Sequence, residues 1–137
     1  MKIVVPVSSA SGAAYARRLR DFLADEGPRH GISADLVFSE TGMQVWMQEI
    51  GQAPKYPFTV WKPRDFSAPF SSGSALGYEA MVVVPCSAGC LARIAHGVSL
   101  DLIGRAAAGM LKEGRRLVLE GDPLWTRVFP PPNNRQR

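Results

Sequence analysis

The amino-acid sequence predicts a single domain of three layers, α/β/α, in which helices cover both faces of a mostly parallel β-sheet. Segments typical of strands alternate with segments whose apolar residues recur at helical spacing, which is the pattern of βαβ units. The strongest strand segments are apolar at every position, as expected for strands that are buried on both faces. The length of 137 residues suits one such domain.

Two strand and helix units occupy the N-terminal part of the chain. Residues 3–7 form a largely β-branched run, which predicts a buried strand. Small residues then lead into a helix predicted over residues 13–23, which a Gly-Pro pair ends. The second unit consists of a strand predicted over residues 34–38 and a short helix over residues 45–50.

Residues 51–72 are the least regular segment, because they contain four prolines. They permit only a short edge strand over residues 58–61, since proline cannot donate a hydrogen bond within a central strand. The order of elements that we count is β-α-β-α-(β)-α-β-α-α-β. This order includes a helix between the edge strand and the strand that follows it.

The C-terminal half contains the clearest strand. Residues 81–84 are all apolar and predict a central strand, which feeds a helix of small and apolar residues through Ala95. A further helix is predicted over residues 100–111, and the last strand over residues 116–119. Such a series of apolar strands and helices requires a sheet that is covered on both faces.

The charge balance is basic, with 16 Lys and Arg against 12 Asp and Glu and a net charge of +4. The basic residues occur singly or in pairs without interleaved aromatic residues, so we expect no nucleic-acid binding. No apolar stretch approaches the roughly 20 residues that span a membrane, and the N-terminal apolar run is too short for a secretory signal. We therefore expect a cytoplasmic protein that does not contact membranes.

The two cysteines, Cys86 and Cys90, are expected to be free thiols, because a disulfide over this spacing conflicts with helical geometry. Together with His96 they do not match a zinc pattern, so no metal site is predicted. A nucleophilic pair of cysteine and histidine is one alternative, and a small core residue at Cys86 is the other.

The carboxyl ends of parallel strands are where ligands bind in such a sheet. The segments that follow the predicted strand ends should therefore converge on one crevice; these ends are Val7, Phe38, Val84 and Leu119. Hydroxyl side chains follow three of them: Ser8, Ser9, Ser11, Ser39, Thr41 and Ser87.

These hydroxyl groups have two interpretations. Neither a dinucleotide fingerprint nor a P-loop follows the first strand, so serines stand where such motifs carry glycines. Hydroxyls beside free backbone N–H groups suit a phosphate or a ring with carbonyl acceptors. Simple helix capping is the alternative. Convergence at one edge favours an anion or cofactor site.

Arg105 and Lys112 are seven residues apart and therefore share one helix face. They can hold a phosphate between them or form an ordinary solvated basic face. Asp101 lies four residues before Arg105, which also permits a surface ion pair.

Three stretches of the sequence carry a family resemblance. Residues 8–12 read S-S-A-S-G, residues 71–74 read S-S-G-S, and residues 81–119 run from M-V-V-V-P-C-S to L-K-E-G-R-R-L-V-L. These stretches resemble the flavin prenyltransferases, formerly described as phenylacrylic-acid or aromatic-acid decarboxylases. The flavin prenyltransferases belong to the superfamily of homo-oligomeric flavin-containing cysteine decarboxylases. The resemblance implies a flavodoxin-like, Rossmann-like fold that binds FMN.

The resemblance also implies roles for individual residues. It implies FMN contacts for Ser9, Ala10, Ser11, Ser39, Ser87, Ala88, Gly89 and Cys90. Ser11 and Lys112 are implied as the catalytic residues. Arg105, Lys112 and Ser74 are implied at the phosphate-bearing prenyl substrate.

The activity implied by the resemblance is transfer of a dimethylallyl group from its phosphate to reduced FMN, without a metal. The prenylated FMN then serves a partner decarboxylase, and the enzymes form trimers that assemble into dodecamers. Two alternatives stay open: an FMN-dependent redox protein or reductase without prenyl transfer, and a non-catalytic flavin-binding partner of a decarboxylase.

The sequence departs from the family pattern near its C-terminal end. Where the family reads P-R-E-T-P-L, residues 119–124 read L-E-G-D-P-L, which has neither the arginine nor the glutamate at the matching positions. Glu120 or Asp122 can supply a carboxylate from a neighbouring position. A last strand, a tyrosine and an arginine that the family carries further on are also expected to be missing. We expect the flavoprotein domain to span residues 1–129, with an extended or disordered tail over residues 130–137.

Overall fold

A computed structural model of the chain describes residues 1–8, 11–54, 57–72 and 77–121. Its centre is a five-stranded parallel sheet in the order β3-β2-β1-β4-β5. The strands are β1 (Lys2–Val7), β2 (Ser33–Phe38), β3 (Thr59–Trp61), β4 (Tyr78–Cys86) and β5 (Arg116–Gly121). Every strand predicted from the sequence is confirmed.

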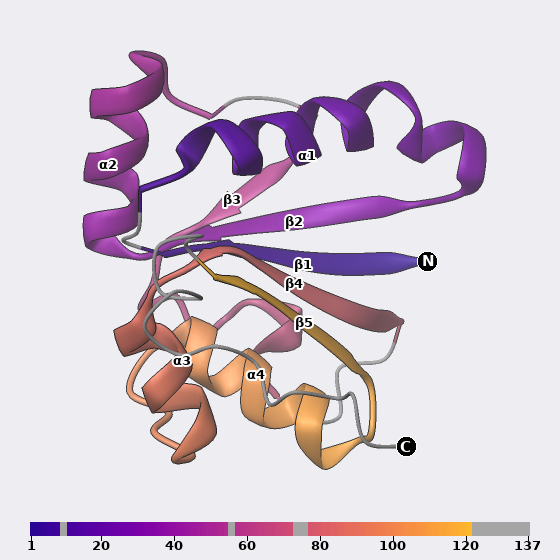
Figure 1. Ribbon diagram of the computed structural model, residues 1–137. Helices are drawn as coiled ribbons and strands as arrows, with labels where there is room; N and C mark the ends of the chain where they lie inside the picture. The colour runs from indigo at the N-terminus through magenta and orange to yellow at the C-terminus, as the bar shows by residue number, and fades with distance from the viewer. Residues whose placement is uncertain (9–10, 55–56, 73–76, 122–137) are drawn as a thin grey trace, which may run out of the picture.

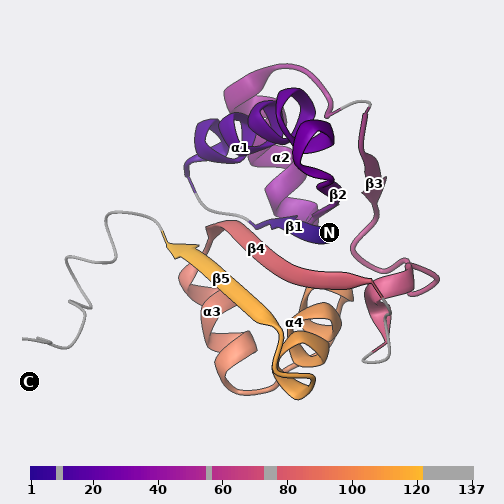
Figure 2. The same cartoon turned by 90° about the vertical axis from the view of Figure 1, so that its right-hand side faces the viewer.

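Helices cover both faces of the sheet, which confirms the predicted three-layer fold class. The helices are α1 (Ala13–Asp25), α2 (Glu40–Ile50), α3 (Ala88–Ala95) and α4 (Leu102–Lys112). Figures 1 and 2 show α1 and α2 on one face and α3 and α4 on the other. None of the helices in the described ranges is long and apolar enough to cross a membrane.

Successive strand residues point into two separate cores, because side chains alternate between the faces of a strand. Val4 packs in the core beneath α3 and α4, and Val5 packs in the core beneath α1 and α2; neither is more than 1% exposed. Val83 and Val84 in β4 divide in the same way. Burial on both faces explains why these strands are apolar at every position.

The chain reverses its direction of winding at the boundary between β1 and β4. It first moves outward from β1 through β2 to β3, and then returns to place β4 on the other side of β1. In open α/β sheets this switch point is where ligands bind, at the carboxyl ends of the strands. The edge that carries the ends of β1, β2 and β4 is therefore the first place to look for a site.

Two differences from the sequence prediction concern helices, and β4 is longer than predicted, since it runs from Tyr78 to Cys86. The helix counted between the edge strand and the central strand is wrong for the described residues, where a single 3-10 turn, Pro69–Ser71, occupies that position. Helix α2 begins at Glu40 rather than at residue 45, because the Ser39 hydroxyl caps it by accepting a hydrogen bond from the Gly42 N–H over 2.9 Å. The predicted tail over residues 130–137 lies outside the described residues.

Gly42 permits the first turn of α2 to lie directly against the end of β1. A Cβ atom at this position would lie 2.3 Å from the carbonyl oxygen of Val7. Only glycine allows this approach without moving the backbone. The result is that Ser39 stays close to the end of β1.

Candidate functional site

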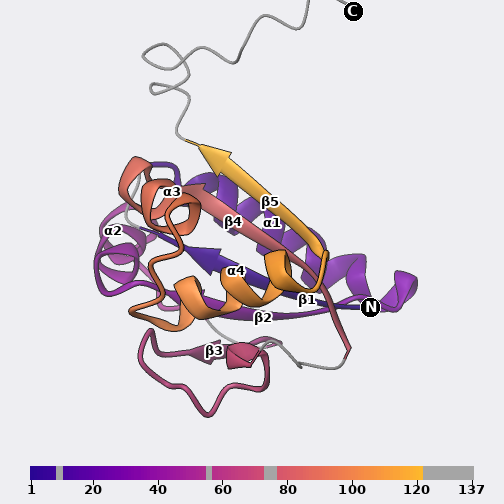
Figure 3. The same ribbon diagram turned by 90° about the horizontal axis from the view of Figure 1, so that it is seen from below.

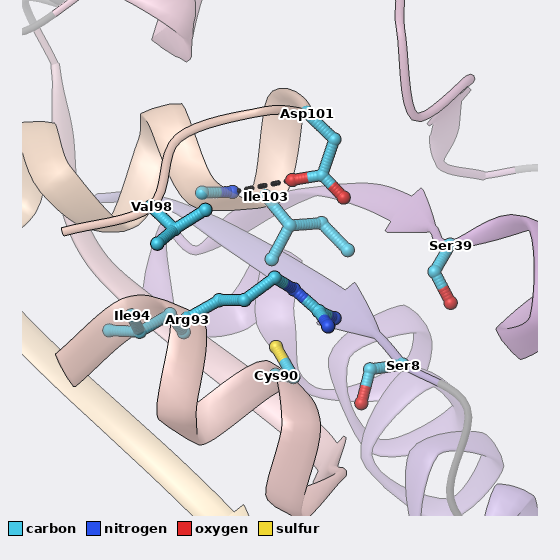
Figure 4. A pocket seen from close by; sticks show the side chains of 9 residues that line it. Ser8, Ser39, Cys90, Arg93, Ile94, Val98, Asp101 and Ile103 are labelled. Carbon is cyan, nitrogen blue, oxygen red and sulfur yellow. Dashed lines mark hydrogen bonds between the residues drawn. The ribbon is translucent and has the colours of Figure 1, made fainter. Parts of the chain in front are cut away.

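The predicted convergence of strand ends is present at the switch-point edge. A small hollow with an accessible volume of about 10 Å³, which is partly open to solvent, lies there. Figure 4 shows the side chains that surround it. Its lining residues are Ser8, Ser39, Cys90, Arg93, Ile94, Val98, Asp101, Ile103 and Gly104. We call this hollow the strand-end cavity.

Ser8 and Ser39 reach the strand-end cavity from neighbouring strands. Val7 and Phe38 are paired in the β1–β2 register, so the serines that follow them leave the sheet side by side. The Ser8 side chain is buried; its hydroxyl donates to the Pro85 carbonyl over 2.9 Å and accepts from the Ser87 N–H over 2.8 Å. Ser8 therefore ties the end of β1 to the end of β4.

Ser39 and Ser87 are both helix caps, which was one of the two interpretations of the hydroxyl groups. The Ser87 hydroxyl accepts from the Cys90 N–H over 3.1 Å at the start of α3, as the Ser39 hydroxyl does at α2. In each case the oxygen accepts the hydrogen bond, so the hydroxyl proton stays available for a further acceptor. Capping and ligand binding are therefore compatible at these two serines.

Cys90 is buried in the first turn of α3 and forms part of the cavity wall. A hydrogen bond from the Cys86 thiol lowers the pKa of Cys90, and the positive charge of Arg93 lowers it further, against the effect of burial. The same hydrogen bond, together with burial, raises the pKa of Cys86. Both cysteines are free thiols, as predicted.

His96 follows the last residue of α3, at the opposite end of this helix from Cys90, and does not line the strand-end cavity. The predicted alternative of a cysteine and histidine pair therefore has no geometric support. In the described ranges, no three His, Cys, Asp or Glu side chains form a group that could hold a metal ion.

Glu49 is a site residue that the sequence analysis missed. Its carboxylate reaches from α2 to the start of α1, where it accepts the Ala13 N–H over 2.9 Å and the Ser11 hydroxyl over 3.5 Å. A negative charge is favourable at this end of a helix. Ser11, a predicted FMN contact and catalytic residue, is thus oriented by a carboxylate.

The predicted phosphate pair lies in a different hollow. Arg105 and Lys112 lie on an exposed face of α4 and line this hollow together with Ser71 of the 3-10 turn, and the Arg105 guanidinium stacks 4.5 Å from the centre of the Phe66 ring. Figure 3 shows α4 running from the edge where the strands end back to the edge where they begin. Lys112, at the far end, therefore lies away from the strand-end cavity of its own chain.

The other predicted site residues are placed as follows. Ala88 and Gly89 are exposed in the first turn of α3. Ser9, Ala10 and Ser74 lie outside the described residues. Asp101 does not pair with Arg105; its carboxylate caps α4 by accepting the Gly104 N–H over 2.8 Å.

Comparison with known proteins places this arrangement in a family. The model of the Flavoprotein family matches residues 1–131. The chain belongs to the Flavoprotein family. The flavoprotein resemblance predicted from the motifs is thereby confirmed.

Several curated relatives of this chain carry the name flavin prenyltransferase UbiX. The flavin prenyltransferase UbiX of Thermoplasma acidophilum is 42% identical over 123 residues, which cover 87% of this chain and 64% of that protein. The chain spans 60% to 64% of the length of the curated relatives that it matches.

Solved structures agree with the fold. A dodecameric FMN-dependent UbiX-like decarboxylase from Escherichia coli O157:H7 has a TM-score of 0.75 at 32% identity, covering 90% of this chain and 68% of that one. AnUbiX (PadA1), solved in complex with FMN and dimethylallyl pyrophosphate, has a TM-score of 0.73 at 35% identity, covering 88% of this chain and 63% of that one.

Proposed function

We propose that this chain binds FMN at the strand-end edge and acts in flavin prenyl transfer, the transfer of a dimethylallyl group from its phosphate to reduced FMN. The observation that carries the proposal is the convergence of Ser8, Ser39 and Cys90 on one cavity at the switch point. It is supported by 42% identity to a flavin prenyltransferase.

The residues at this edge suit FMN chemically. Ser39 and Ser87 each keep a hydroxyl proton to donate, and the first turns of α2 and α3 present backbone N–H groups that favour an anion. Ile103 and Val98 add apolar wall, which an aromatic ring system requires. These groups would hold the cofactor, and reduced FMN supplies the nucleophilic ring to which the allyl group is joined.

The size of the strand-end cavity supports a site that is completed by a second copy of the chain. Ligand sites usually enclose about 300–1,000 Å³, whereas the strand-end cavity has an accessible volume of only about 10 Å³, so one chain alone does not enclose a flavin. The basic hollow on α4 is a candidate for the missing part, because Lys112 lies at the end of α4 that is remote from the strand-end cavity of its own chain. We therefore propose a homo-oligomer, as in the dodecameric relative from Escherichia coli.

The basic pair has a clear task in such a site. Negative charge grows on the phosphate as the allylic bond breaks, and cations that are fixed beside the leaving group stabilise this charge. Arg105 and Lys112 would bind the substrate phosphate in this way. Glu49 would keep the Ser11 hydroxyl in one orientation by accepting its hydrogen bond.

The test is a prenyl-transfer assay under anaerobic conditions. Purified protein is mixed with FMN, reduced with dithionite, and supplied with dimethylallyl phosphate; the absorbance spectrum and the mass of the extracted flavin are then measured. Samples without the prenyl phosphate serve as the control. We expect a flavin of increased mass, and an unchanged flavin would contradict the transferase activity.

A second candidate is an FMN-dependent redox protein without prenyl transfer. It is favoured by residues 119–124, which lack the arginine and glutamate of the family segment. Bound FMN that is reduced reversibly, and that dimethylallyl phosphate leaves unchanged, would support this function. Delivery of a product to a partner decarboxylase and the cytoplasmic localisation stay predictions.

A further inference from the structure

Arg93 is the strongest positive group in the strand-end cavity, and neither the motifs nor the family resemblance assigns it a role. Its side chain extends from α3 across the cavity, with the guanidinium directed toward Ser8 and Ser39 (Figure 4). It lies one turn after Cys90 on the same helix.

The guanidinium of Arg93 has no protein partner among the described residues. It forms no ion pair within 4.0 Å and donates no hydrogen bond, unlike Arg17, Arg20 and Arg29, which all pair with carboxylates. Asp101, the acidic group in the cavity wall, is already bound at one oxygen by the Gly104 N–H. The five donors of Arg93 are therefore available to a ligand.

The surroundings of Arg93 can accept an anion. Ser39 offers a hydroxyl proton on the facing wall, and the first turn of α2 begins there. The positive charge of Arg93 acts inside the cavity, where it lowers the pKa of Cys90, and the Asp101 carboxylate acts there in the opposite sense with a smaller effect. A planar guanidinium matches the oxygen atoms of a phosphate in a bidentate geometry, which a flavin ring or a sugar hydroxyl does not exploit.

We propose that Arg93 binds the phosphomonoester of FMN in the strand-end cavity and so makes the protein select FMN over riboflavin, which lacks the phosphate. This inference rests on the proposed flavin binding and adds a residue that determines ligand specificity.

The experiment compares two flavins on four proteins by isothermal titration calorimetry. The proteins are the full chain, Arg93→Met, Arg93→Lys and, as a matched control, Arg18→Met on the exposed surface of α1. Methionine keeps the apolar part of the arginine side chain and removes its charge. Circular dichroism and melting temperatures establish that the variants are folded.

We expect the unaltered chain and Arg18→Met to bind FMN more tightly than riboflavin. Arg93→Met should lose roughly tenfold to a hundredfold in FMN affinity, the range of a hydrogen bond to a charged group, with riboflavin affinity unchanged. The FMN affinity of Arg93→Lys should lie between those of the unaltered chain and Arg93→Met, because lysine keeps the charge and loses the planar geometry.

The outcomes separate this inference from the proposed function. If the unaltered chain binds FMN and Arg93→Met binds it equally well, the inference is overturned and FMN binding stands. An equal loss for FMN and riboflavin also overturns it, since Arg93 would then contact the part that both flavins share. If the unaltered chain binds neither flavin, the proposed function fails and the inference fails with it.

Discussion

At the residue scale, the pKa values of the two cysteines are shifted in opposite directions, because the Cys86 thiol donates a hydrogen bond to Cys90. Cys90 accepts the hydrogen bond, which stabilises its thiolate, and Cys86 donates, which keeps it protonated. The two residues are the whole cysteine content of the chain. Their reactivity can therefore be read without interference from other thiols.

Alkylation by iodoacetamide should modify Cys90 first, and its rate should reach half of its maximum at a pH below the ordinary thiol value of about 8.5. A lowered pKa means that the reactive thiolate is already present at a pH where other thiols are protonated. Mass spectrometry of peptides measures the rate at each pH. Cys86→Ala should raise the pKa of Cys90 and move the profile to higher pH; an unmoved profile would contradict the assigned cause.

Glu49 stabilises the start of α1 by accepting the Ala13 N–H beside the positive end of the helix. Glu49→Gln keeps an acceptor and removes the charge, so we expect a loss of about 0.3–1 kcal/mol in the free energy of unfolding. Urea denaturation measures it. Gln48→Ala, at the exposed neighbouring position, is the control and should change stability by less than about 0.5 kcal/mol. Equal effects of both changes would refute the capping role.

Individual site residues differ in how far the sequence could predict them. Ser8 and Ser39 follow strand ends directly, and Cys90 lies in the first helical turn after β4, so topology alone brought them to one edge. Glu49 and Arg93 project from helices, and the direction of a helical side chain depends on how the helix packs. Glu49 also acts on Ala13, 36 residues earlier, and no local pattern indicates such a contact.

At the scale of elements, the start of α2 depends on the absence of one side chain. Gly42→Ala would place a Cβ atom 2.3 Å from the Val7 carbonyl oxygen, so α2 or β1 must move. We expect a loss of about 1–3 kcal/mol and a displaced Ser39. Thermal unfolding and FMN titration measure the two effects.

Gly89→Ala is the matched control for this substitution. Its added Cβ atom would meet only the flexible end of Arg93, at 3.4 Å, and alanine favours the helix by up to about 1 kcal/mol. Stability should therefore be kept or increased. A Gly42→Ala protein as stable as Gly89→Ala would show that the contact between α2 and β1 is not tight.

Elements with a continuous apolar pattern were the ones that the sequence predicted well. β1, β2, β4 and β5 were all found, although β4 extends from Tyr78 to Cys86, beyond the apolar residues 81–84. Its first residues include the polar Glu79 and pair with the neighbouring strands through the backbone. The helix predicted before β4 is absent from the described residues of that segment. The segment is rich in proline, and its small and apolar residues do not recur at helical spacing.

At the scale of the whole molecule, the strand-end cavity includes the first turn of α4, whereas Lys112 in the basic hollow lies at the other end of this helix. If two copies combine these surfaces, a mixture of two inactive variants should recover activity. Ser39→Gly removes a cavity hydroxyl at a cap position where glycine costs only a few tenths of a kcal/mol, and Lys112→Ala removes a phosphate cation. Co-expression of the two chains should restore about a quarter of the sites in random assemblies.

The prenyl-transfer assay on co-purified assemblies measures this recovery. A mixture that stays as inactive as either variant alone would mean that each chain supplies both groups to its own site. Separately purified variants that are mixed without exchange of subunits provide the control.

The sequence predicted that the sheet is mostly parallel, but it did not predict the order of the strands. Alternation of strands and helices indicated parallel pairing, and the crossovers confirm it. The position of β4 next to β1 depends on the connection that returns from β3, and this irregular segment carries no periodic pattern from which its path can be predicted. The assembly of copies depends on surfaces between chains, which the pattern of one chain does not define.

The sheet also separates two hydrophobic cores, one on each of its faces. Cys90 and Arg93 stand on helix α3, with the core that contains Val4, whereas Glu49 and Ser11 belong to the side of the core that contains Val5. A substitution that repacks one core leaves the other in place, because backbone hydrogen bonds hold the strands between them. The α3 side of the edge, which carries Cys90 and Arg93, can therefore be altered by substitution without repacking the core beneath α1 and α2.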